Sequence, residues 1–287
     1  MPRYVGIAGV QMAVDYGVDN TDAMMNSLDR VVALFPWVDI VVFSELCVNG
    51  LDLQLAAPVP NPFIDRFRQW AKTEKKWLIP GSFYERAEEK IYNTSAVISP
   101  QGEIAATYRK IFPWKPLEKN DAGNRFCIFD IPGKGRLGLC ICYDIWFPEV
   151  IRNLAWMGAE AVFCPTATYT SDRSQELILA QANAICNQVY VFNVNGVGAG
   201  GVGRSILVDP EGHVLQESGE GHAIMTEVID LDVVTRVREY GTLGTSQLWK
   251  NLRDFKGSFP MYEKEIKKGE IFRQLGPLRL NTKIGGG

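Results

Sequence analysis

Short apolar runs and amphipathic segments alternate along most of this chain. Runs typical of buried strands occupy 4–12, 39–44 and 77–84. Between the first two, apolar side chains recur every three or four residues, and this periodicity predicts a helix over 21–35. Strands that alternate with helices in this way are typical of an α/β fold.

The second part of the chain adds strands joined by short turns, and two further helices. Clusters of Gly, Pro, Asp and Gln predict three antiparallel pairs: 92–99 with 103–110, 126–131 with 137–142, and two strands within 204–216. Further elements are a helix at 148–159, a strand at 161–166, a helix at 174–187 and a strand at 189–195. Because no linker interrupts this pattern, we expect a single domain over 1–245.

Composition and charge exclude several classes of protein. Hydrophobic residues make up 46% of the chain and charged residues 22%, a balance typical of globular domains. The net charge is −3, so no basic excess is available to bind a nucleic acid. No apolar run approaches the ~18 residues needed to span a bilayer, and no signal peptide is recognised. We therefore predict a cytoplasmic protein with neither a nucleic-acid nor a membrane partner.

The C-terminal segment 246–287 differs from the rest of the chain. It holds nine Lys or Arg and four Asp or Glu, with scattered aromatic residues and little periodicity. Two interpretations stay open at this point. The segment is either an arm that packs on a partner subunit or a solvated surface extension.

The cysteines and histidines narrow the possible chemistry. Most of the six cysteines lie in apolar runs, where a buried, unreactive thiol is the usual case. No C-x-x-C motif occurs, and His213 and His222 both lie in sequences typical of turns, so a zinc site is not expected. A hydrolase with a cysteine nucleophile would here need a base other than histidine.

Three chemically complementary residues follow predicted strands. Glu45 follows VVFS, Lys110 closes AATYRK, and Cys142 closes RLGLCIC. Each alone is more often structural, but together they supply a base, an electrophile and a nucleophile. The backbone N–H of Tyr143 is the nearest candidate for a second donor to an oxyanion.

The segments around these residues resemble the signature stretches of the nitrilase superfamily, the carbon–nitrogen hydrolases. The segments are FSELCVNG, YRKIFPW and LCICYDIWFPE, in the same order and at similar separations. The resemblance covers about 4–245. It implies an α/β fold that forms a four-layer α-β-β-α sandwich, and a homodimer or higher homo-oligomer.

The resemblance also implies a mechanism for an amidohydrolase. Cys142 would attack the amide carbonyl, Glu45 would move the proton, and Lys110 with the Tyr143 N–H would hold the oxyanion. A thioester on Cys142 would then be hydrolysed to a carboxylic acid, with no metal or organic cofactor required. Glu118, in KIFPWKPLE, resembles the second glutamate of the amidase-type branches, which positions substrate and lysine.

The residues after the nucleophile favour a small neutral amide as substrate. Cys142 is followed by Tyr143 and Asp144, as on the amidase side of the superfamily. Trp146 stands where many relatives carry an arginine, and tryptophan suits an apolar group better than a carboxylate. Arg173 keeps an alternative open, because it could recruit the carboxylate of an N-carbamoyl amino acid. A nitrile is a further alternative, since the same three residues would hydrolyse it.

Two interpretations of a different class compete with the amidase. Residues 198–203 satisfy the G-x-G-x-x-G pattern of dinucleotide-binding proteins, but that motif needs a following helix. The stretch 204–210 instead indicates a strand that ends in a turn. A non-catalytic scaffold with the same fold is the second competitor, and the intact set of Glu45, Lys110 and Cys142 argues against it.

Overall fold

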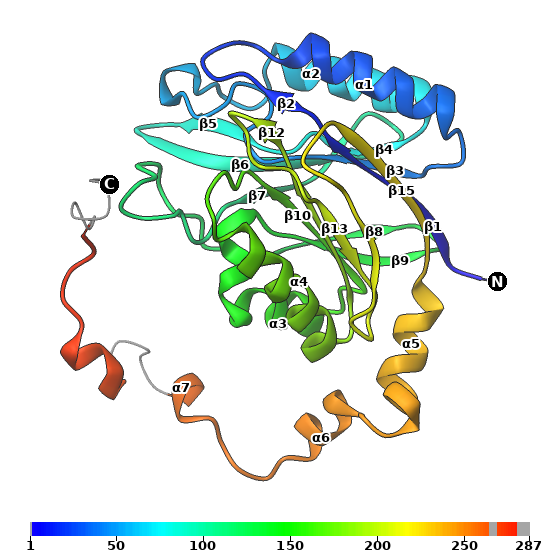
Figure 1. The fold of residues 1–287 in the computed structure, drawn as a ribbon, viewed down its shortest axis with the longest axis vertical. Helices are drawn as coiled ribbons and strands as arrows, with labels where there is room; N and C mark the ends of the chain where they lie inside the picture. The colour runs from blue at the N-terminus through cyan, green and yellow to red at the C-terminus, as the bar shows by residue number, and fades with distance from the viewer. Residues whose placement is uncertain (1, 264–268, 280–287) are drawn as a thin grey trace.

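Two β-sheets pack face to face, and helices cover the outer face of each sheet (Figure 1). The computed structural model describes residues 2–263 and 269–279. The helices of the two outer layers are α1 (Thr21–Leu34) and α2 (Pro62–Glu74) on one sheet, and α3 (Pro148–Trp156) and α4 (Arg173–Asn187) on the other. The α-β-β-α sandwich expected from the sequence is confirmed.

The first sheet has seven strands and is buried on both faces. Its spatial order is β15 (Ala223–Asp230), β1 (Tyr4–Gln11), β3 (Ile40–Phe43), β4 (Trp77–Ile79), β6 (Lys90–Ile98) and β5 (Phe83–Ala87), with β7 (Ile104–Arg109) also paired to β6. Within β1, Val5 and Ile7 face the second sheet, whereas Ala8 and Val10 face the helices. This alternation follows from the two-residue period of a strand.

The second sheet has six strands. Its spatial order is β14 (Val214–Glu217), β13 (Ile206–Val208), β11 (Tyr190–Asn195), β10 (Ala161–Thr166), β9 (Gly135–Leu139) and β8 (Cys127–Ile131). The three central strands β9, β10 and β11 are parallel. The predicted pairs β6–β7, β8–β9 and β13–β14 are all confirmed. A further two-stranded sheet joins β12 (Val197–Gly198) to β2 (Ala13–Val14).

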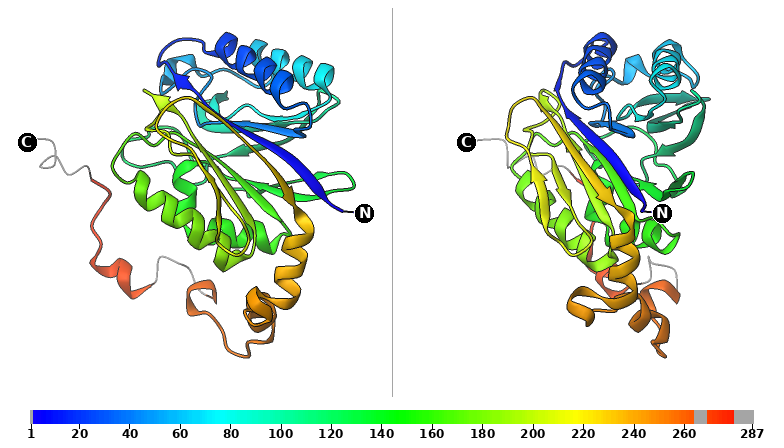
Figure 2. Two further views of the ribbon diagram at one scale, coloured as in Figure 1. Left: turned by 45° about the vertical axis from the view of Figure 1, so that its right-hand side comes forward. Right: turned by 90° about the vertical axis from the view of Figure 1, so that its right-hand side faces the viewer.

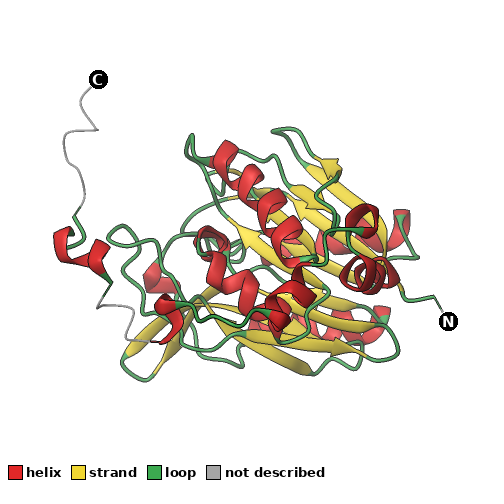
Figure 3. Cartoon of the chain, turned by 90° about the horizontal axis from the view of Figure 1, so that it is seen from below, coloured by secondary structure: helices red, strands yellow, loops and turns green. Residues whose placement is uncertain are grey.

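The outer helices are amphipathic, so each buries one face on its sheet. On α1 the buried side chains include Met24, Leu28 and Val31, and on α2 they include Ile64 and Phe67. In the view from below, helices on the side opposite α1 and α2 lie in front of the strands (Figure 3). Among the described helices, none combines the length and the apolar character that crossing a bilayer requires.

The structure corrects two sequence-based expectations. The strand predicted over 77–84 is wrong, because the chain turns at Gly81 and divides it into β4 and β5. The strand predicted over 137–142 ends at Leu139, and Cys142 begins a short 3₁₀ helix instead. Three further elements, α2, β15 and the helix α5 (Leu231–Tyr240), were not predicted from the sequence.

The C-terminal segment leaves the sandwich after α5 (Figure 2). Its described elements are α6 (Leu248–Asp254), α7 (Pro260–Glu263) and a 3₁₀ turn at Glu270–Gln274. Trp249 packs against the core, but most other side chains here are exposed. The outer face of α3 and α4 also carries exposed apolar residues, with Trp156 75% and Ile178 65% exposed. The domain boundary at 245, the partner-binding arm and the homo-oligomer stay predictions.

We predict that Gly81→Ala destabilises the protein strongly. Gly81 has a φ of +67°, and a Cβ at this position would lie 1.8 Å from the carbonyl oxygen of Ser44. We expect the free energy of unfolding to fall by about 3 kcal/mol or more, measured by denaturant titration. Gly133→Ala is the matched control, since its φ of +75° is similar but a Cβ there meets nothing within 4 Å. Equal losses in the two variants would contradict the prediction.

Candidate active site

The carboxyl ends of strands from both sheets border one cavity of about 320 Å³. Its wall comes from the loops after β3, β7, β9 and β10, at 45–53, 114–119, 142–146 and 167–176, together with Tyr84. Crevices beyond the carboxyl ends of strands are the usual place for ligands in α/β folds. The cavity is therefore the candidate active site.

Glu45 connects the two sheets at this cavity. It follows β3, and its backbone N–H donates to the carbonyl of Thr166 at the end of β10, 3.2 Å away. Its side chain is buried, and Oε1 accepts hydrogen bonds from Asn93 Nδ2 and Lys110 Nζ, each at 2.8 Å. The backbone of Glu45 is thus tied to the second sheet, whereas its carboxylate is held by residues of the first sheet.

Lys110 is completely buried between two carboxylates. Its Nζ lies 2.8 Å from Glu45 Oε1 and 2.7 Å from Glu118 Oε1. Burial alone would lower the pKa of Lys110, but the negative charges around it outweigh burial and raise that pKa well above its usual value. The ammonium therefore keeps its charge at neutral pH.

Glu118 completes the group of charges on the loop after β7. Its backbone N–H donates to the carbonyl oxygen of Trp114 at 2.9 Å, which closes a turn within this loop. Burial raises the pKa of Glu118, against the opposing effect of Lys110. The two glutamates and the lysine predicted from sequence are thus brought together in space, although 73 residues separate the first from the last along the chain.

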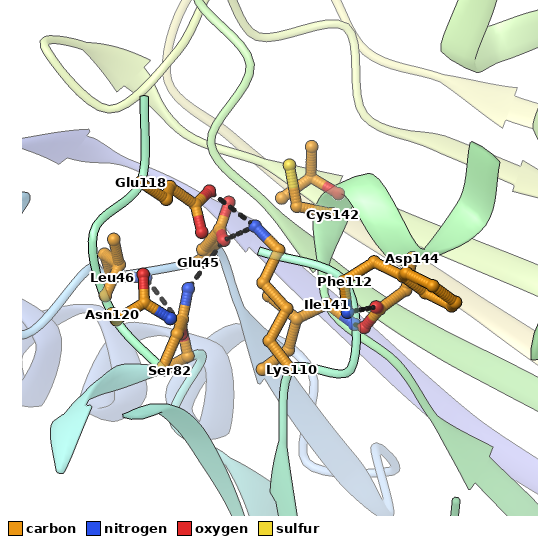
Figure 4. A network of polar contacts seen from close by, with 12 residues as sticks. Glu45, Leu46, Ser82, Lys110, Phe112, Glu118, Asn120, Ile141, Cys142 and Asp144 are labelled. Atoms are coloured by element: carbon orange, nitrogen blue, oxygen red, sulfur yellow. Dashed lines mark hydrogen bonds and ion pairs between the residues drawn. The ribbon is translucent and has the colours of Figure 1, made fainter. Parts of the chain in front are cut away.

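Cys142 presents its sulfur to the same cavity. Its φ of +48° is unusual for a residue with a side chain, and it marks a sharp turn after β9. Figure 4 shows the side chains of Glu45, Lys110, Glu118 and Cys142 gathered around one point. Burial raises the pKa of the Cys142 thiol well above its usual value, Glu45 raises it further, and Lys110 partly offsets the rise. The resting nucleophile is therefore a neutral thiol, and a base must take its proton when it attacks.

Asp144 holds the turn that carries Cys142. It is fully buried, and its carboxylate accepts hydrogen bonds from the Tyr108 hydroxyl at 2.6 Å and from the backbone N–H of Ile141 and Phe112 at 2.9 Å. Burial raises the pKa of Asp144 to about 6. The residue thereby ties the loop after Lys110 to the loop of the nucleophile. No catalytic role was predicted for Asp144 from the sequence, and its hydrogen bonds support a structural role.

Tyr143 and Trp146 line the cavity next to Cys142, and their role as substrate-binding residues stays a prediction. Their rings pack against each other with centroids 6.1 Å apart. They give the cavity an aromatic wall, which suits an apolar acyl group.

The expectation that Arg173 could recruit a substrate carboxylate is wrong. Arg173 is 2% exposed and does not belong to the described cavity wall. Its guanidinium donates to Glu176 Oε2 at 2.9 Å and to the carbonyl of Arg204 at 2.7 Å. The sequence shows that Arg173 carries a positive charge, but it does not show that this charge is paired with Glu176, a buried glutamate three residues later.

Sequence reasoning missed Thr168 and Glu176, which also line the cavity. Thr168 Oγ1 lies 3.9 Å from Cys142 Sγ and 2.7 Å from Glu176 Oε2. The available signals were weak: Thr168 follows a predicted strand, and Glu176 lies in the first turn of a predicted helix. The glycines at 198–203 lead into β13 and not into a helix, so the dinucleotide-binding interpretation fails.

Comparisons with known proteins show the family of this chain. The family described as Carbon-nitrogen hydrolase matches residues 4–239. A formamidase of Bacillus thuringiensis (strain Al Hakam) is 30% identical over 234 residues, which cover 77% of this chain and 69% of that protein. The chain belongs to the carbon–nitrogen hydrolase family.

Solved structures place the fold within the nitrilase superfamily. Saccharomyces cerevisiae Nit3, a member of branch 10 of that superfamily, has a TM-score of 0.76 at 26% identity, covering 88% of this chain and 97% of Nit3. A Glu-to-Gln variant of the amidase from Nesterenkonia sp. AN1 has a TM-score of 0.72 at 25% identity, covering 82% and 97%. In that structure, acrylamide has added to the active-site cysteine.

We predict that Glu45→Gln lowers the pKa of the Cys142 thiol. Removing a neighbouring negative charge favours the thiolate, while Lys110 and its positive charge remain. Titration of the thiolate absorbance, with Cys142→Ala as the blank, measures this pKa. Glu160→Gln is the matched control, because Glu160 is paired with Arg3 at 2.8 Å, outside the described cavity wall. An unchanged or higher pKa of Cys142 in Glu45→Gln would contradict the prediction.

Proposed function

We propose that this chain is an amidase that cleaves the C–N bond of a small neutral amide. The single observation that carries the proposal is the position of Lys110, bound to Glu45 and Glu118 beside a cavity lined by Cys142. The wall combines a nucleophile, Cys142, with a base, Glu45, and no histidine belongs to its described part. The buried cation Lys110 lies behind the wall, paired with its two glutamates. The family membership and the formamidase and amidase relatives support the same chemistry.

In the first half of the reaction the substrate acylates Cys142. The S–C bond forms as the thiol proton passes to Glu45. A base is required because the raised pKa of the Cys142 thiol keeps it protonated at rest. The carbonyl oxygen becomes negative, and Lys110 and the Tyr143 N–H stabilise it. Glu45 then returns the proton to the nitrogen, the C–N bond breaks, and ammonia leaves a thioester on Cys142.

In the second half water replaces ammonia. Glu45 takes a proton from the water as its oxygen attacks the thioester carbon, and the same donors stabilise the second oxyanion. The C–S bond then breaks, the proton returns to sulfur, and the carboxylic acid is released. Glu118 acts through Lys110, because its Oε1 accepts from the ammonium and fixes its position.

The charges on the cavity wall favour a substrate without a carboxylate. Glu45, Glu118, Asp172 and Glu176 all line the cavity, with Lys119 as the basic residue on its described wall. A carboxylate placed among these groups would meet net repulsion. This charge pattern favours the neutral amide over an N-carbamoyl amino acid. Nitrile hydrolysis uses the same three residues, and the products of a matched nitrile and amide separate the two activities.

We predict that the purified protein releases ammonia from short aliphatic amides. Cys142→Ala should lower kcat/KM by a factor of about 10⁴ or more, because the nucleophile is lost. Cys186→Ala is the matched control, since that exposed cysteine lies on the outer face of α4 and should leave the rate unchanged. Neutral amides should exceed N-carbamoyl amino acids at least ~10-fold in kcat/KM. A preference for the carbamoyl acids would contradict the proposed substrate class.

A further inference from the structure

A second buried ion pair lies at the cavity, on residues that the proposed mechanism does not use. Glu176 and Arg173 are each 2% exposed, and Glu176 Oε2 lies 2.9 Å from Arg173 Nη1. Both residues belong to the first turn of α4. Within the described residues, the cavity wall includes Glu176 but not Arg173. A bound molecule therefore meets the carboxylate half of this pair.

Glu176 retains capacity to accept a hydrogen bond. Its Oε2 accepts from Thr168 Oγ1 at 2.7 Å and from Arg173 Nη1 at 2.9 Å. In the part of the chain that the structure describes, Oε1 accepts a single long bond, from Trp146 Nε1 at 3.3 Å. An ionised carboxylate has about four acceptor positions, so a donor on a ligand can still be accommodated.

The carboxylate lies close to the reacting sulfur. Thr168 connects the two, with Oγ1 3.9 Å from Cys142 Sγ and 2.7 Å from Glu176 Oε2. Two contacts of this length place Glu176 within reach of a group on the carbon next to a carbonyl that Sγ attacks.

We propose that Glu176 is a specificity-determining residue that accepts a hydrogen bond from a hydroxyl or ammonium group on the carbon next to the substrate carbonyl. The preferred substrates are then 2-hydroxy and 2-amino amides, not unsubstituted aliphatic ones. This inference rests on the proposed amidase function and changes its substrate class, from neutral amides in general to amides with a hydroxyl or a cationic ammonium group next to the carbonyl. Asp172 on the same wall adds negative charge that favours a donor.

The experiment compares three amides with the same carbon skeleton: propionamide, lactamide and alaninamide. For the wild-type protein at neutral pH we expect kcat/KM for lactamide and alaninamide to exceed that for propionamide by about tenfold or more, as charge-assisted hydrogen bonds to a buried carboxylate do. Glu176→Gln should bring both ratios close to one. The glutamine side chain has a single acceptor oxygen, which is a weaker acceptor than a carboxylate and would also have to accept from Thr168 and Arg173.

Two further variants separate specificity from structure. Glu160→Gln makes the same change in an ion pair outside the described cavity wall and should keep the wild-type ratios. The double variant Arg173→Gln/Glu176→Gln removes both buried charges together, which avoids an unpaired guanidinium if the single variant folds poorly. It should also lose the discrimination.

Each remaining outcome contradicts a different claim. If Glu176 only braced Thr168 and Trp146, Glu176→Gln would slow all three amides by the same factor and leave the ratios unchanged. Wild-type protein that hydrolyses propionamide as well as the other two amides would overturn the assignment of Glu176 while leaving the amidase intact. Failure to release ammonia from any probe would overturn the proposed function itself, and the inference with it.

Discussion

The buried ammonium of Lys110 between two carboxylates is the interaction on which the rest of the site depends. Two buried glutamates this close together would repel each other, and one of them would take up a proton. Lys110 contacts both at 2.7–2.8 Å, so it joins them instead. Removing one member of such a group leaves a buried charge without its partner, which costs several kcal/mol. The position of each charge therefore depends on the other two.

The two sheets explain why this group forms at one point. Glu45 comes from the first sheet and Cys142 from the second, and the hydrogen bond from Glu45 N to Thr166 O connects the sheets at the cavity. Gly81 supports the same region, since its turn lies directly against Ser44. Asp144 then ties the loop after Lys110 to the turn of the nucleophile. The packing of the two sheets therefore also fixes the geometry of the site.

Much of the fold could be predicted because strands and helices leave clear periodic patterns. The strands at 161–166 and 189–195 and the helix at 174–187 are confirmed within one residue at each end. The turn at Gly81 was missed, because apolar residues on both sides of 80–82 conceal the break. β15 was missed as well, although it pairs with β1 along eight residues. A pairing of two segments that lie more than 200 residues apart has no local signal.

The candidate site likewise has residues that could be predicted from the sequence and residues that could not. Glu45, Lys110, Glu118 and Cys142 stand in recognisable sequence segments after predicted strands, and the structure brings them together. The contacts of Arg173 were not predictable, because a charged residue does not reveal which neighbour it pairs with. Thr168 and Glu176 carry no motif, and their importance arises from three-dimensional contact with Cys142 and Trp146.

The central claim is that an acyl group passes through the sulfur of Cys142. Rapid quenching of the wild-type protein during turnover of a saturating amide, followed by peptide mass spectrometry, tests it most directly. The account predicts an added acyl mass on the peptide that holds Cys142, and conversion of that adduct to a hydroxamate when hydroxylamine is present. Ammonia release with the acyl group on another residue, or without any hydroxamate, would contradict the account.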